Sequence, residues 1–549
     1  MDIVVIGGGA AGLKAATRAR RRNEEASITV VDAGKYPSLG RCGLPYYVGG
    51  IVNELNDLRK TTYGAVRDEE YFKKLFNIEV LTETRAKKID RGRRTVLIEK
   101  DGKEDELPYD YLVIATGARP SIPPIPNIDA EGVTTLTDPE SAEKILEMWM
   151  EGDVSNAVII GGGLIGLETA EALRMLDLKV TLIEALPNVL PALLDQEMAM
   201  LVERHLTEKG IRVLTNTLVR EIVAEDRVRA VKTDKEEIPA DIVIVATGVK
   251  PNVELAKDCG LKIGETGAIK VNEFMQTSDE RIFAGGDCVE NINLITGKPV
   301  YTPLGDIANK HGRVIGDNVT GGKSKFPGVI GTSIAKVFDF TIARTGLTER
   351  EARSLGYDAV GVLAPAFDRA HYFPQANTIR LKLIFDRKTL RVLGAQGVGL
   401  GVIDKRIDVI ATAIQAGMTI DDLANLDLAY APPYSPAIDP VITAAYVSRN
   451  LYDGLFEAVD VNYVKERLNR DDVVILDLRS ENETRLLKIE AKNVLNIPLP
   501  ELRERISEIP KDKEIITVCP LGLRAYNAAS ILKNMGYKVK VMMGGLTFW

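Results

Sequence analysis

The stretch IVVIGGGAAGL, residues 3–13, decides the fold of the N-terminal part of the chain. Its apolar start predicts a short buried strand, its glycines predict a turn, and residues 13–22 have the composition of a helix. A second apolar run over residues 27–31 ends in Asp32. Strand, glycine turn, helix, strand and acid follow one another in the order of a dinucleotide-binding β-α-β unit.

Each part of this unit has a physical role in holding a nucleotide. Gly7 permits the tight turn, Gly9 lets the backbone approach a pyrophosphate, and Gly12 lets helix and strand pack closely. The helix N-terminus would face the phosphates, and the acid at the end of the second strand can accept hydrogen bonds from a ribose. The candidate binding residues are Gly7, Gly9, Ala10, Ala11, Gly12 and Asp32.

The same unit recurs further along the chain. An apolar run over residues 157–160, a glycine turn, a helical stretch to Leu176 and a second apolar run lead to Glu184. No arginine follows this acid to bind a 2′-phosphate, and a carboxylate favours a free 2′-hydroxyl, so that the unit is expected to prefer NADH over NADPH. Its candidate binding residues are Gly161, Gly163, Gly166 and Glu184.

Three more segments carry glycine-terminated strands. YLVIATG (residues 111–117) and IVIVATG (residues 242–248) are predicted to be the crossings where the chain passes between the two nucleotide domains. RIFAGGD ends in Asp287, and the segment TPLGDIANKHG (residues 302–312) predicts a loop followed by a helix start. His311 in that helix is predicted to be a surface or capping residue rather than a catalytic one.

These motifs, in this order, resemble the two-dinucleotide-domain flavoprotein disulfide reductases over about residues 1–450. The resemblance implies FAD at the first unit, NAD(P)H at the second, Asp287 near the ribityl and pyrophosphate groups, and residues 302–312 against the flavin ring. The resemblance also provides further candidate cofactor-binding residues, which are Ala115, Thr116, Gly117, Gly248, Asp287, Pro303 and Ala308.

The C-terminal part of the chain has its own pattern. VVILDLR (residues 473–479) predicts a buried strand, CPLGLRA (residues 519–525) predicts a strand-to-helix loop, and GGLTFW ends the chain. The pattern resembles a rhodanese domain, with IEAKN (residues 489–493) in place of its usual His-Ile-Pro-Gly-Ala. Backbone N–H groups around Cys519 would lower the pKa of its thiol and hold a persulfide, with Arg524 adding positive charge. A degenerate, inactive domain is the alternative.

The predicted fold class is therefore α/β with four parts. Two interleaved Rossmann-like domains are expected: an FAD-binding domain over residues 1–110 plus 248–325, and an NAD(H)-binding domain over residues 111–247. An α+β dimerisation domain over residues 326–450 and an α/β rhodanese-like domain over residues 457–549 are expected to follow.

The stretch SLGRCGLPYY, residues 38–47, carries the predicted redox centre. It has one cysteine, Cys42, and Tyr47 stands where the dithiol members of the family have a second cysteine. The stretch resembles the single-cysteine subgroup, which comprises coenzyme A-disulfide reductases, coenzyme A persulfide or polysulfide reductases, and NADH oxidases and peroxidases. In members that reduce coenzyme A disulfides, a mixed disulfide with coenzyme A replaces the missing partner.

Two aromatic loops, HYFP (residues 371–374) and AYAPPY (residues 429–434), stand out in the predicted dimerisation domain. Taken alone, such loops are typical of rigid connectors or interface anchors. By the resemblance, Tyr372 and Tyr430 come from the other subunit of a homodimer or higher oligomer and serve the thiol chemistry. A phenol can stabilise a leaving thiolate by hydrogen bonding or by donating its proton.

Charged residues near Cys42 are candidates for binding the substrate. Arg41 precedes the cysteine and is expected to lower its pKa or to hold an anionic substrate, unless it points to solvent. The arginines at the end of the first helix could hold the phosphates of coenzyme A, although a solvated face is the alternative. The candidates are Ser38, Arg41, Arg18 and Arg22.

Composition excludes several classes of function. The 549 residues include 70 basic and 78 acidic ones, net −8, with no basic block for a nucleic-acid partner. No window has the roughly 20 apolar residues of a membrane span, and the N-terminal run is too short for a signal peptide, so that a cytoplasmic location is expected. The four scattered cysteines indicate neither a zinc site nor a disulfide framework, and Cys259 and Cys288 are expected to be inert.

The sequence thus predicts an enzyme that uses NADH and FAD to reduce a persulfide, a polysulfide or a coenzyme A disulfide or persulfide at Cys42. Cys519 is expected to exchange sulfane sulfur with the same small-molecule pool. The first alternative is an NADH oxidase or peroxidase that uses a Cys42 sulfenic acid. The second is a sulfur carrier that responds to redox state without turnover.

Overall fold

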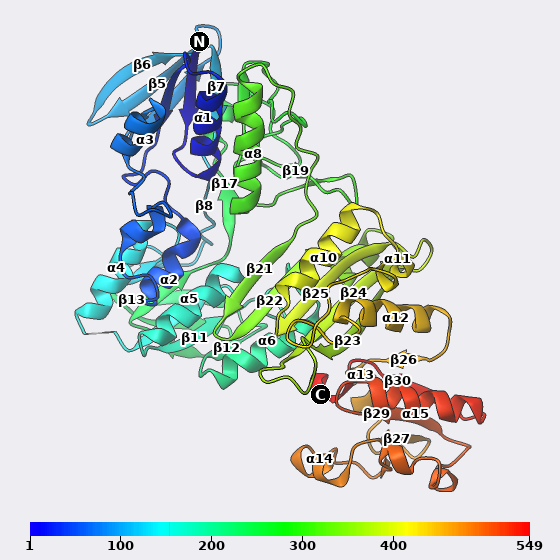
Figure 1. The fold of residues 1–549 in the computed structure, drawn as a ribbon. Coiled ribbons are helices and arrows are strands. Elements are labelled where there is room, and N and C mark those ends of the chain that lie inside the picture. The colour runs from blue at the N-terminus through cyan, green and yellow to red at the C-terminus, as the bar shows by residue number, and fades with distance from the viewer. Residues whose placement is uncertain (153) are drawn as a thin grey trace. The chain divides into compact units, whose positions relative to one another are not determined.

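The computed structural model describes residues 1–152 and 154–549, and the described chain forms two compact units. Unit 1 comprises Met1–Leu186 and Gly210–Val329, and unit 2 comprises Pro187–Lys209 and Ile330–Trp549. Figure 1 shows the elements along the chain. Residues 187–209 fall inside the predicted NAD(H)-binding domain but cluster with unit 2, and the proposed domain boundaries otherwise stay predictions.

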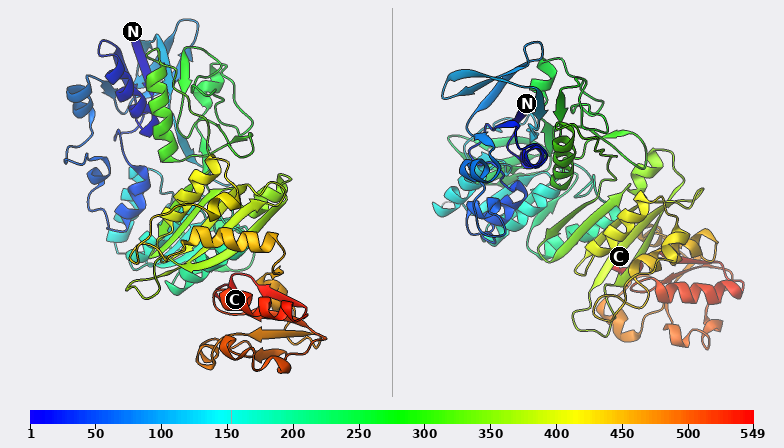
Figure 2. Two further views of the ribbon diagram at one scale, coloured as in Figure 1. Left: turned by 45° about the vertical axis from the view of Figure 1, so that its right-hand side comes forward. Right: turned by 45° about the horizontal axis from the view of Figure 1, so that its top comes forward.

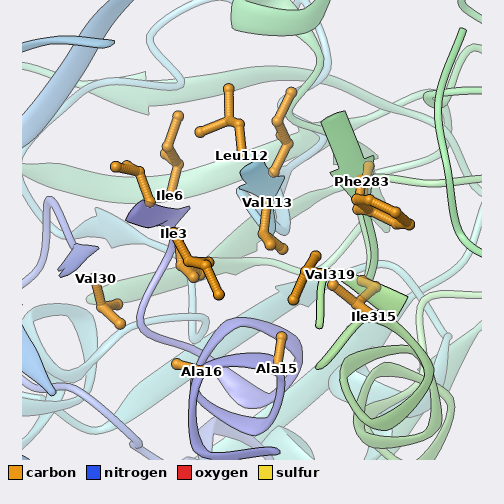
Figure 3. Close-up of a cluster of buried hydrophobic side chains, with 14 of the residues drawn as sticks. Ile3, Ile6, Ala15, Ala16, Val30, Leu112, Val113, Phe283, Ile315 and Val319 are labelled. Atoms are coloured by element: carbon orange, nitrogen blue, oxygen red, sulfur yellow. The ribbon is translucent and has the colours of Figure 1, made fainter. Parts of the chain in front are cut away.

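The first glycine-rich unit folds around a five-stranded parallel sheet in unit 1. Its order is β18 (Ile282–Ala284), β7 (Tyr111–Ile114), β1 (Asp2–Ile6), β2 (Ser27–Val31) and β3 (Glu79–Leu81). The helices α1 (Ala10–Arg22) and α8 (Gly305–Asn318) pack against it. Figure 3 shows side chains of β1, β7 and β18 meeting Ala15 and Ala16 of α1 and Ile315 of α8 in one buried core.

The second glycine-rich unit builds an equivalent parallel sheet in unit 1. Its order is β12 (Arg212–Leu214), β11 (Lys179–Ile183), β10 (Asn156–Ile160), β16 (Ile242–Val245) and β9 (Val133–Thr134). The helix α5 (Leu164–Met175) follows its glycine turn, and α4 (Pro139–Met150) precedes β10. Unit 1 also has two three-stranded antiparallel sheets: β4 (Arg85–Asp90), β5 (Thr95–Lys100) and β6 (Lys103–Pro108), and β13 (Val219–Ala224), β14 (Val228–Thr233) and β15 (Glu237–Pro239).

The two predicted crossings lie side by side. After β7 the chain forms β8 (Ala118–Pro120), and after β16 it forms β17 (Val249–Pro251); the two strands pair in an antiparallel ribbon. The Thr116 hydroxyl donates to the Asn252 carbonyl at 2.7 Å, and the Asn252 amide donates back to the Thr116 carbonyl at 2.9 Å. Both crossings are therefore confirmed, and they are hydrogen-bonded to each other.

Unit 2 contains a five-stranded antiparallel sheet with helices on both faces. Its order is β21 (Ser333–Val337), β22 (Phe340–Gly346), β25 (Val392–Gly399), β24 (Thr378–Asp386) and β23 (Ala359–Phe367). The helices α10 (Asp404–Gln415) and α12 (Pro440–Tyr452) cover one face, as Figure 2 shows. The segment leading into α6 (Gln196–Glu208) packs on the other, and the short helices α9 (Glu349–Ser354) and α11 (Ile420–Ala424) lie at the sheet's margins.

A buried ion cluster ties the α6 segment to this sheet. Lys382 of β24 is 2% exposed, and its Nζ lies 2.8 Å from Asp195 Oδ2, 2.5 Å from Glu197 Oε1 and 2.7 Å from Glu349 Oε2. The Gln396 side-chain amide also donates to Asp195 at 2.8 Å. Because one ammonium group compensates three carboxylates, the charge of Lys382 holds the cluster together.

The C-terminal part of unit 2 is a five-stranded parallel sheet. Its order is β26 (Ala458–Val459), β30 (Val539–Met542), β29 (Glu514–Val518), β27 (Val473–Asp477) and β28 (Val494–Asn496). The helices α13 (Val461–Lys465), α14 (Glu481–Leu486) and α15 (Leu523–Asn534) belong to it. Strands β27 and β29 are buried almost throughout, which explains their near-continuous apolar sequences. No helix in the described part of the chain is long and apolar enough to cross a membrane.

Candidate active site

The first glycine turn is shaped to receive a phosphate group. Gly7 has φ +113°, and a Cβ built on it would lie 2.1 Å from the Ala115 carbonyl oxygen. A Cβ on Gly12 would lie 1.9 Å from the Gly7 carbonyl oxygen, whereas a Cβ on Gly9, the N-cap of α1, would meet nothing within 4 Å. The turn therefore requires glycine where the backbone is crowded and leaves open space at the helix N-terminus, as a dinucleotide requires.

The acid of this unit is fixed by the backbone. Asp32 Oδ2 accepts a hydrogen bond from the Gly8 N–H at 2.9 Å, and Oδ1 accepts one from the Gly34 N–H at 2.9 Å. Ala11, Ala115 and Ala308 form a small buried cluster beside the turn. The structure thus brings together predicted residues from three distant parts of the sequence, and the geometry fits an adenine dinucleotide.

The second glycine turn repeats this arrangement. Glu184 Oε2 accepts from the Gly162 N–H at 2.8 Å, and Oε1 accepts from the Leu186 N–H at 2.9 Å. Gly163 is the N-cap of α5, and a Cβ there would also meet nothing within 4 Å. Unit 1 therefore has two glycine turns of the same construction, each with the geometry that a dinucleotide requires.

Cys42 is attached to the first of these sites. It lies in a short 3₁₀ turn, Arg41–Gly43, directly before α2 (Leu44–Val48), and it is exposed with a free thiol. The Ser38 N–H donates to the Gly8 carbonyl at 2.9 Å, which fastens the cysteine loop to the glycine turn. The thiol thus stands at a fixed place relative to the nucleotide site.

The pKa of the Cys42 thiol is raised, whereas the sequence led us to expect a lowered pKa. Partial burial, then the charges of Glu168 and Asp287, raise the pKa of the Cys42 thiol. The expected lowering of this pKa by Arg41 was wrong. Arg41 acts instead on Asp287, whose pKa is raised by burial and lowered in part by the nearby guanidinium.

Unit 2 presents the two predicted tyrosines on adjoining loops. Tyr372 is 67% exposed and Tyr430 is 54% exposed. The Ala370 N–H donates to the Pro432 carbonyl at 3.2 Å, which joins the loops. Buried Arg406 anchors the chain next to each tyrosine loop. Its guanidinium donates to the Asp368 carbonyl at 2.7 Å and to the Asp439 carboxylate at 3.0 Å.

The C-terminal sheet presents Cys519 at the end of β29. Its Sγ accepts hydrogen bonds from the Gly522 N–H at 3.2 Å and the Ala525 N–H at 3.3 Å, and the residue is 1% exposed. Arg524 forms a bidentate pair with Glu483 at 2.8 and 2.6 Å, and this contact lowers the pKa of Glu483 to about 2. The predicted N–H cup is confirmed, while the charge of Arg524 is shared with a carboxylate that the sequence pattern had not singled out.

A cavity of about 530 Å³ joins the Cys519 loop to the tyrosine loops within unit 2. Tyr372 and Tyr430 line it on one side, and Leu521, Gly522 and Leu523 line it on the other. Most of its other lining residues are apolar, with Arg369 and His371 among the polar ones. A molecule in this cavity would touch both tyrosines and residues 521–523, while Cys519 itself, 1% exposed, is not among the lining residues.

Comparison with known protein families agrees with this geometry. Residues 1–298 match the family described as pyridine nucleotide-disulphide oxidoreductase, residues 332–441 match its dimerisation domain, and residues 460–549 match a rhodanese-like domain. The chain is a pyridine nucleotide-disulphide oxidoreductase with a C-terminal rhodanese-like domain.

Individual relatives of this oxidoreductase include sulfur reductases and an oxidase. The chain is 41% identical over 445 residues to an NAD(P)H coenzyme A polysulfide/persulfide reductase of Pyrococcus horikoshii, covering 81% of this chain and 98% of that protein. It is 39% identical to an NADH oxidase of Methanocaldococcus jannaschii, with the same coverage.

Two solved structures are similar along the whole chain. One is a NAD-dependent persulfide reductase from A. fulgidus, at 63% identity and a TM-score of 0.96, covering 100% of both chains. The other is reduced CoADR-RHD of Bacillus anthracis, at 38% identity and a TM-score of 0.92, covering 100% of this chain and 97% of that one. The predicted fold class and family are confirmed.

His311 of the oxidoreductase is not the surface residue that the sequence predicted. It is fully buried in α8, its Nδ1 accepts a hydrogen bond from the Gly286 N–H at 3.1 Å, and its ring meets Phe326 edge to face. Burial lowers the pKa of His311 to about 4, so that the ring is neutral at ordinary pH and can accept this bond. The residue supports the turn that carries Asp287.

The candidate substrate arginines of α1 already have partners. Arg18 Nε lies 2.6 Å from Asp317 Oδ1, and Arg22 Nε donates to the Thr320 hydroxyl at 3.1 Å. These contacts join α1 to α8. A role for Arg18 and Arg22 in binding a substrate stays a prediction, as do the roles of Ser38 and Arg41.

Sequence reasoning missed Glu168, whose charge raises the pKa of the Cys42 thiol. It lies in α5, one turn after the second glycine turn, and its pKa is raised to about 7, first by burial and then by the charge of Glu171. Near neutral pH it therefore changes charge beside a thiol whose own pKa its carboxylate raises. The signal in the sequence was an acid within an otherwise apolar helix start, LIGLE.

Replacing Glu168 with glutamine should lower the pKa of the Cys42 thiol, because a neighbouring negative charge that disfavours the thiolate is removed. The measurement is the rate of Cys42 alkylation by iodoacetamide between pH 6 and 10, followed by mass spectrometry of the Cys42 peptide. Glu151→Gln, an exposed change at the end of α4, is the control. Identical pH profiles for Glu168→Gln and wild type would contradict the prediction.

Proposed function

We propose that this oxidoreductase uses NADH and FAD to reduce a persulfide, a polysulfide, or a coenzyme A disulfide or persulfide at Cys42, and that Cys519 exchanges sulfane sulfur with the same pool. The observation that carries this proposal is the cysteine loop fastened to the first glycine turn by the Ser38–Gly8 hydrogen bond. Since Tyr47 replaces a second cysteine, the sulfur that completes the redox pair must arrive with the substrate. Relatives named as persulfide and coenzyme A disulfide reductases support this choice.

The residues fit both cofactors. The open N-terminus of α1, with Asp32, would hold FAD, and the equivalent site at α5, with Glu184, would hold NADH in preference to NADPH. Asp287, Pro303 and Ala308 would border the flavin. When bound, the flavin supplies two-electron transfer between the nicotinamide and the sulfur centre.

Cys42 would carry the covalent chemistry. Its thiolate attacks an S–S bond of the substrate, so that one S–S bond breaks while a new one forms at Cys42. The departing sulfur takes a proton, and a two-electron reduction of the new bond restores the Cys42 thiolate. The overall reaction with a persulfide is NADH + H⁺ + RSSH → NAD⁺ + RSH + H₂S, which balances in atoms and charge.

Tyr372 and Tyr430 would supply that proton, acting across the interface of a homodimer on Cys42 of the partner subunit. Their exposure on joined loops supports this role, because each phenol is free to meet a second chain. The match to a dimerisation domain supports the oligomer. The cavity that they share with the Cys519 loop would let sulfur pass from one thiol centre toward the other. The four free cysteines agree with a reducing, cytoplasmic setting.

An NADH oxidase that uses a Cys42 sulfenic acid is the second candidate, and relatives named NADH oxidase favour it. The backbone N–H groups that bind Cys519 Sγ, and the cavity lined by residues 521–523, favour sulfur transfer, since oxygen reduction requires neither.

The test is NADH turnover by the full chain, measured anaerobically with coenzyme A persulfide, polysulfide and coenzyme A disulfide, and separately with oxygen. We expect turnover with at least one sulfur acceptor to exceed oxygen turnover by at least about tenfold. Cys519→Ala should lower turnover with polysulfide severalfold and leave turnover with coenzyme A disulfide unchanged, and Cys259→Ala is its control. Faster turnover with oxygen would instead establish the oxidase.

A further inference from the structure

A buried arginine close to the cysteine loop has no partner. Arg59 ends the 3₁₀ turn Leu55–Arg59 and is 7% exposed, and its Nε is enclosed without a hydrogen-bond acceptor. Its guanidinium lies 5.4 Å from the centre of the Tyr36 ring. Only this Nε is enclosed, and within residues 1–152 and 154–549 no hydrogen bond or ion pair joins the Arg59 guanidinium to a carboxylate, carbonyl or hydroxyl.

Among the described residues, the other three buried arginines each have at least one acceptor, although the Nε of Arg406 also lacks one. Arg20 donates to the carbonyls of Phe76 and Asn77, Arg406 pairs with Asp439, and Arg479 pairs with Asp477. A guanidinium always carries its charge, and leaving a buried charge without a partner costs more than an ordinary hydrogen bond contributes. The acceptor that Arg59 lacks is therefore expected on a ligand.

The position of Arg59 indicates what that ligand is. Tyr36 follows Asp32 by four residues, and the Leu58 carbonyl accepts a hydrogen bond from the Gly40 N–H at 3.0 Å. Arg59 thus contacts Tyr36, and its neighbour Leu58 contacts Gly40, both within the segment that runs from the acid Asp32 to Cys42. A ligand lying along this segment is a nucleotide, and its anionic groups are phosphates.

We propose that Arg59 binds a phosphate group of the nucleotide that occupies this segment, with the Tyr36 ring fixing the plane of the guanidinium. A planar guanidinium binds phosphate through two parallel N–H donors, which an ammonium group cannot reproduce. The inference rests on the proposed function only in naming two sources for the phosphate, FAD and coenzyme A.

The experiment measures the affinity of Arg59→Met for each source. FAD is titrated into full-length apoprotein by fluorescence, and coenzyme A is titrated into the FAD-loaded protein by calorimetry. Arg85→Met, which removes an exposed arginine of β4, is the matched control. We expect Arg59→Met to weaken one ligand at least tenfold and Arg85→Met to weaken neither.

The two titrations separate the sources. A loss confined to FAD assigns the phosphate to the flavin nucleotide, and a loss confined to coenzyme A assigns it to that ligand. Unchanged affinity for both overturns the proposal. Neither titration depends on turnover. The affinities can therefore be interpreted even if the proposed reaction is not found.

Thermal unfolding without ligand distinguishes a binding role from a structural one. Because Arg59→Met removes a buried charge that lacks a partner, the ligand-free variant should unfold at the same temperature as wild type or higher. If Arg59→Met does not fold, the same unfolding and binding measurements are made on Arg59→Lys. Native-like unfolding of Arg59→Lys together with weakened binding supports the proposal, and unchanged binding by Arg59→Lys overturns it.

Discussion

Replacing Cys42 with serine should reduce NADH-dependent turnover on persulfide by at least about 10³-fold. A serine hydroxyl is almost entirely protonated at neutral pH and cannot form an S–S bond, so that the variant loses its covalent intermediate. In stopped-flow measurements, NADH should still bleach the visible absorbance of the bound cofactor, while recovery of absorbance on adding persulfide should be lost. Cys259→Ser, at a half-buried cysteine, should behave like wild type.

Unimpaired recovery in the Cys42 variant would remove this thiol from the reaction. Persistence of absorbance recovery with oxygen alone would show that the oxidase reaction does not need it. The two readouts therefore separate the sulfur reaction from the oxygen reaction in one variant.

The same variant tests the tyrosines in mixed dimers. A dimer of one Cys42→Ser subunit and one Tyr372→Phe/Tyr430→Phe subunit contains one intact site if the tyrosines act across subunits. Such a dimer should recover about half of the wild-type activity, because each of its parents is impaired at both sites. Activity no higher than the average of the two parents would place the tyrosines and Cys42 in the same subunit.

Replacing Lys382 with methionine should lower the free energy of unfolding by about 3–5 kcal/mol, because three carboxylates would lose their shared cation. Burial alone would lower the pKa of Lys382, but Glu197, Glu349 and Asp195 together raise it, so that the side chain stays charged. Urea unfolding followed by circular dichroism measures the change. Lys388→Met, an exposed lysine in the turn after β24, is the control.

The loss should be partly recovered when Glu349→Gln is added to Lys382→Met, since one uncompensated charge is then removed. An unfolding midpoint equal to that of Lys388→Met would show that the cluster contributes nothing to stability. No recovery in the double variant would show that packing of the Lys382 stem, rather than its charge, holds the α6 segment.

Local patterns in the sequence were enough for the parts of the fold that depend on neighbours in the chain. The glycine turns, the acids at Asp32 and Glu184, and the loop around Cys519 have the predicted geometry because each is formed within a short stretch. The crossings were also predictable, because buried parallel strands have near-continuous apolar sequences.

Contacts between distant segments were out of reach. His311 was predicted to be a surface or capping residue from the general burial tendency of histidine, yet α8 places it under the Gly286 turn. The electrostatic effect of Arg41 on Asp287 requires the folded chain, as does the ion pair of Lys382 with Glu197, 185 positions earlier. The lack of a partner at Arg59 is likewise visible only when every neighbour is in place.

The paired crossings constrain how the two nucleotide sheets of unit 1 can move. Because β8 and β17 form a ribbon with Thr116 and Asn252 locked at its edge, neither connection can stretch or bend alone. A two-stranded ribbon resists sliding along its length but twists readily. At this junction, relative motion of the two sheets is therefore expected as a twist of the ribbon, and the packing of α2 against α4 and α5 restricts that twist.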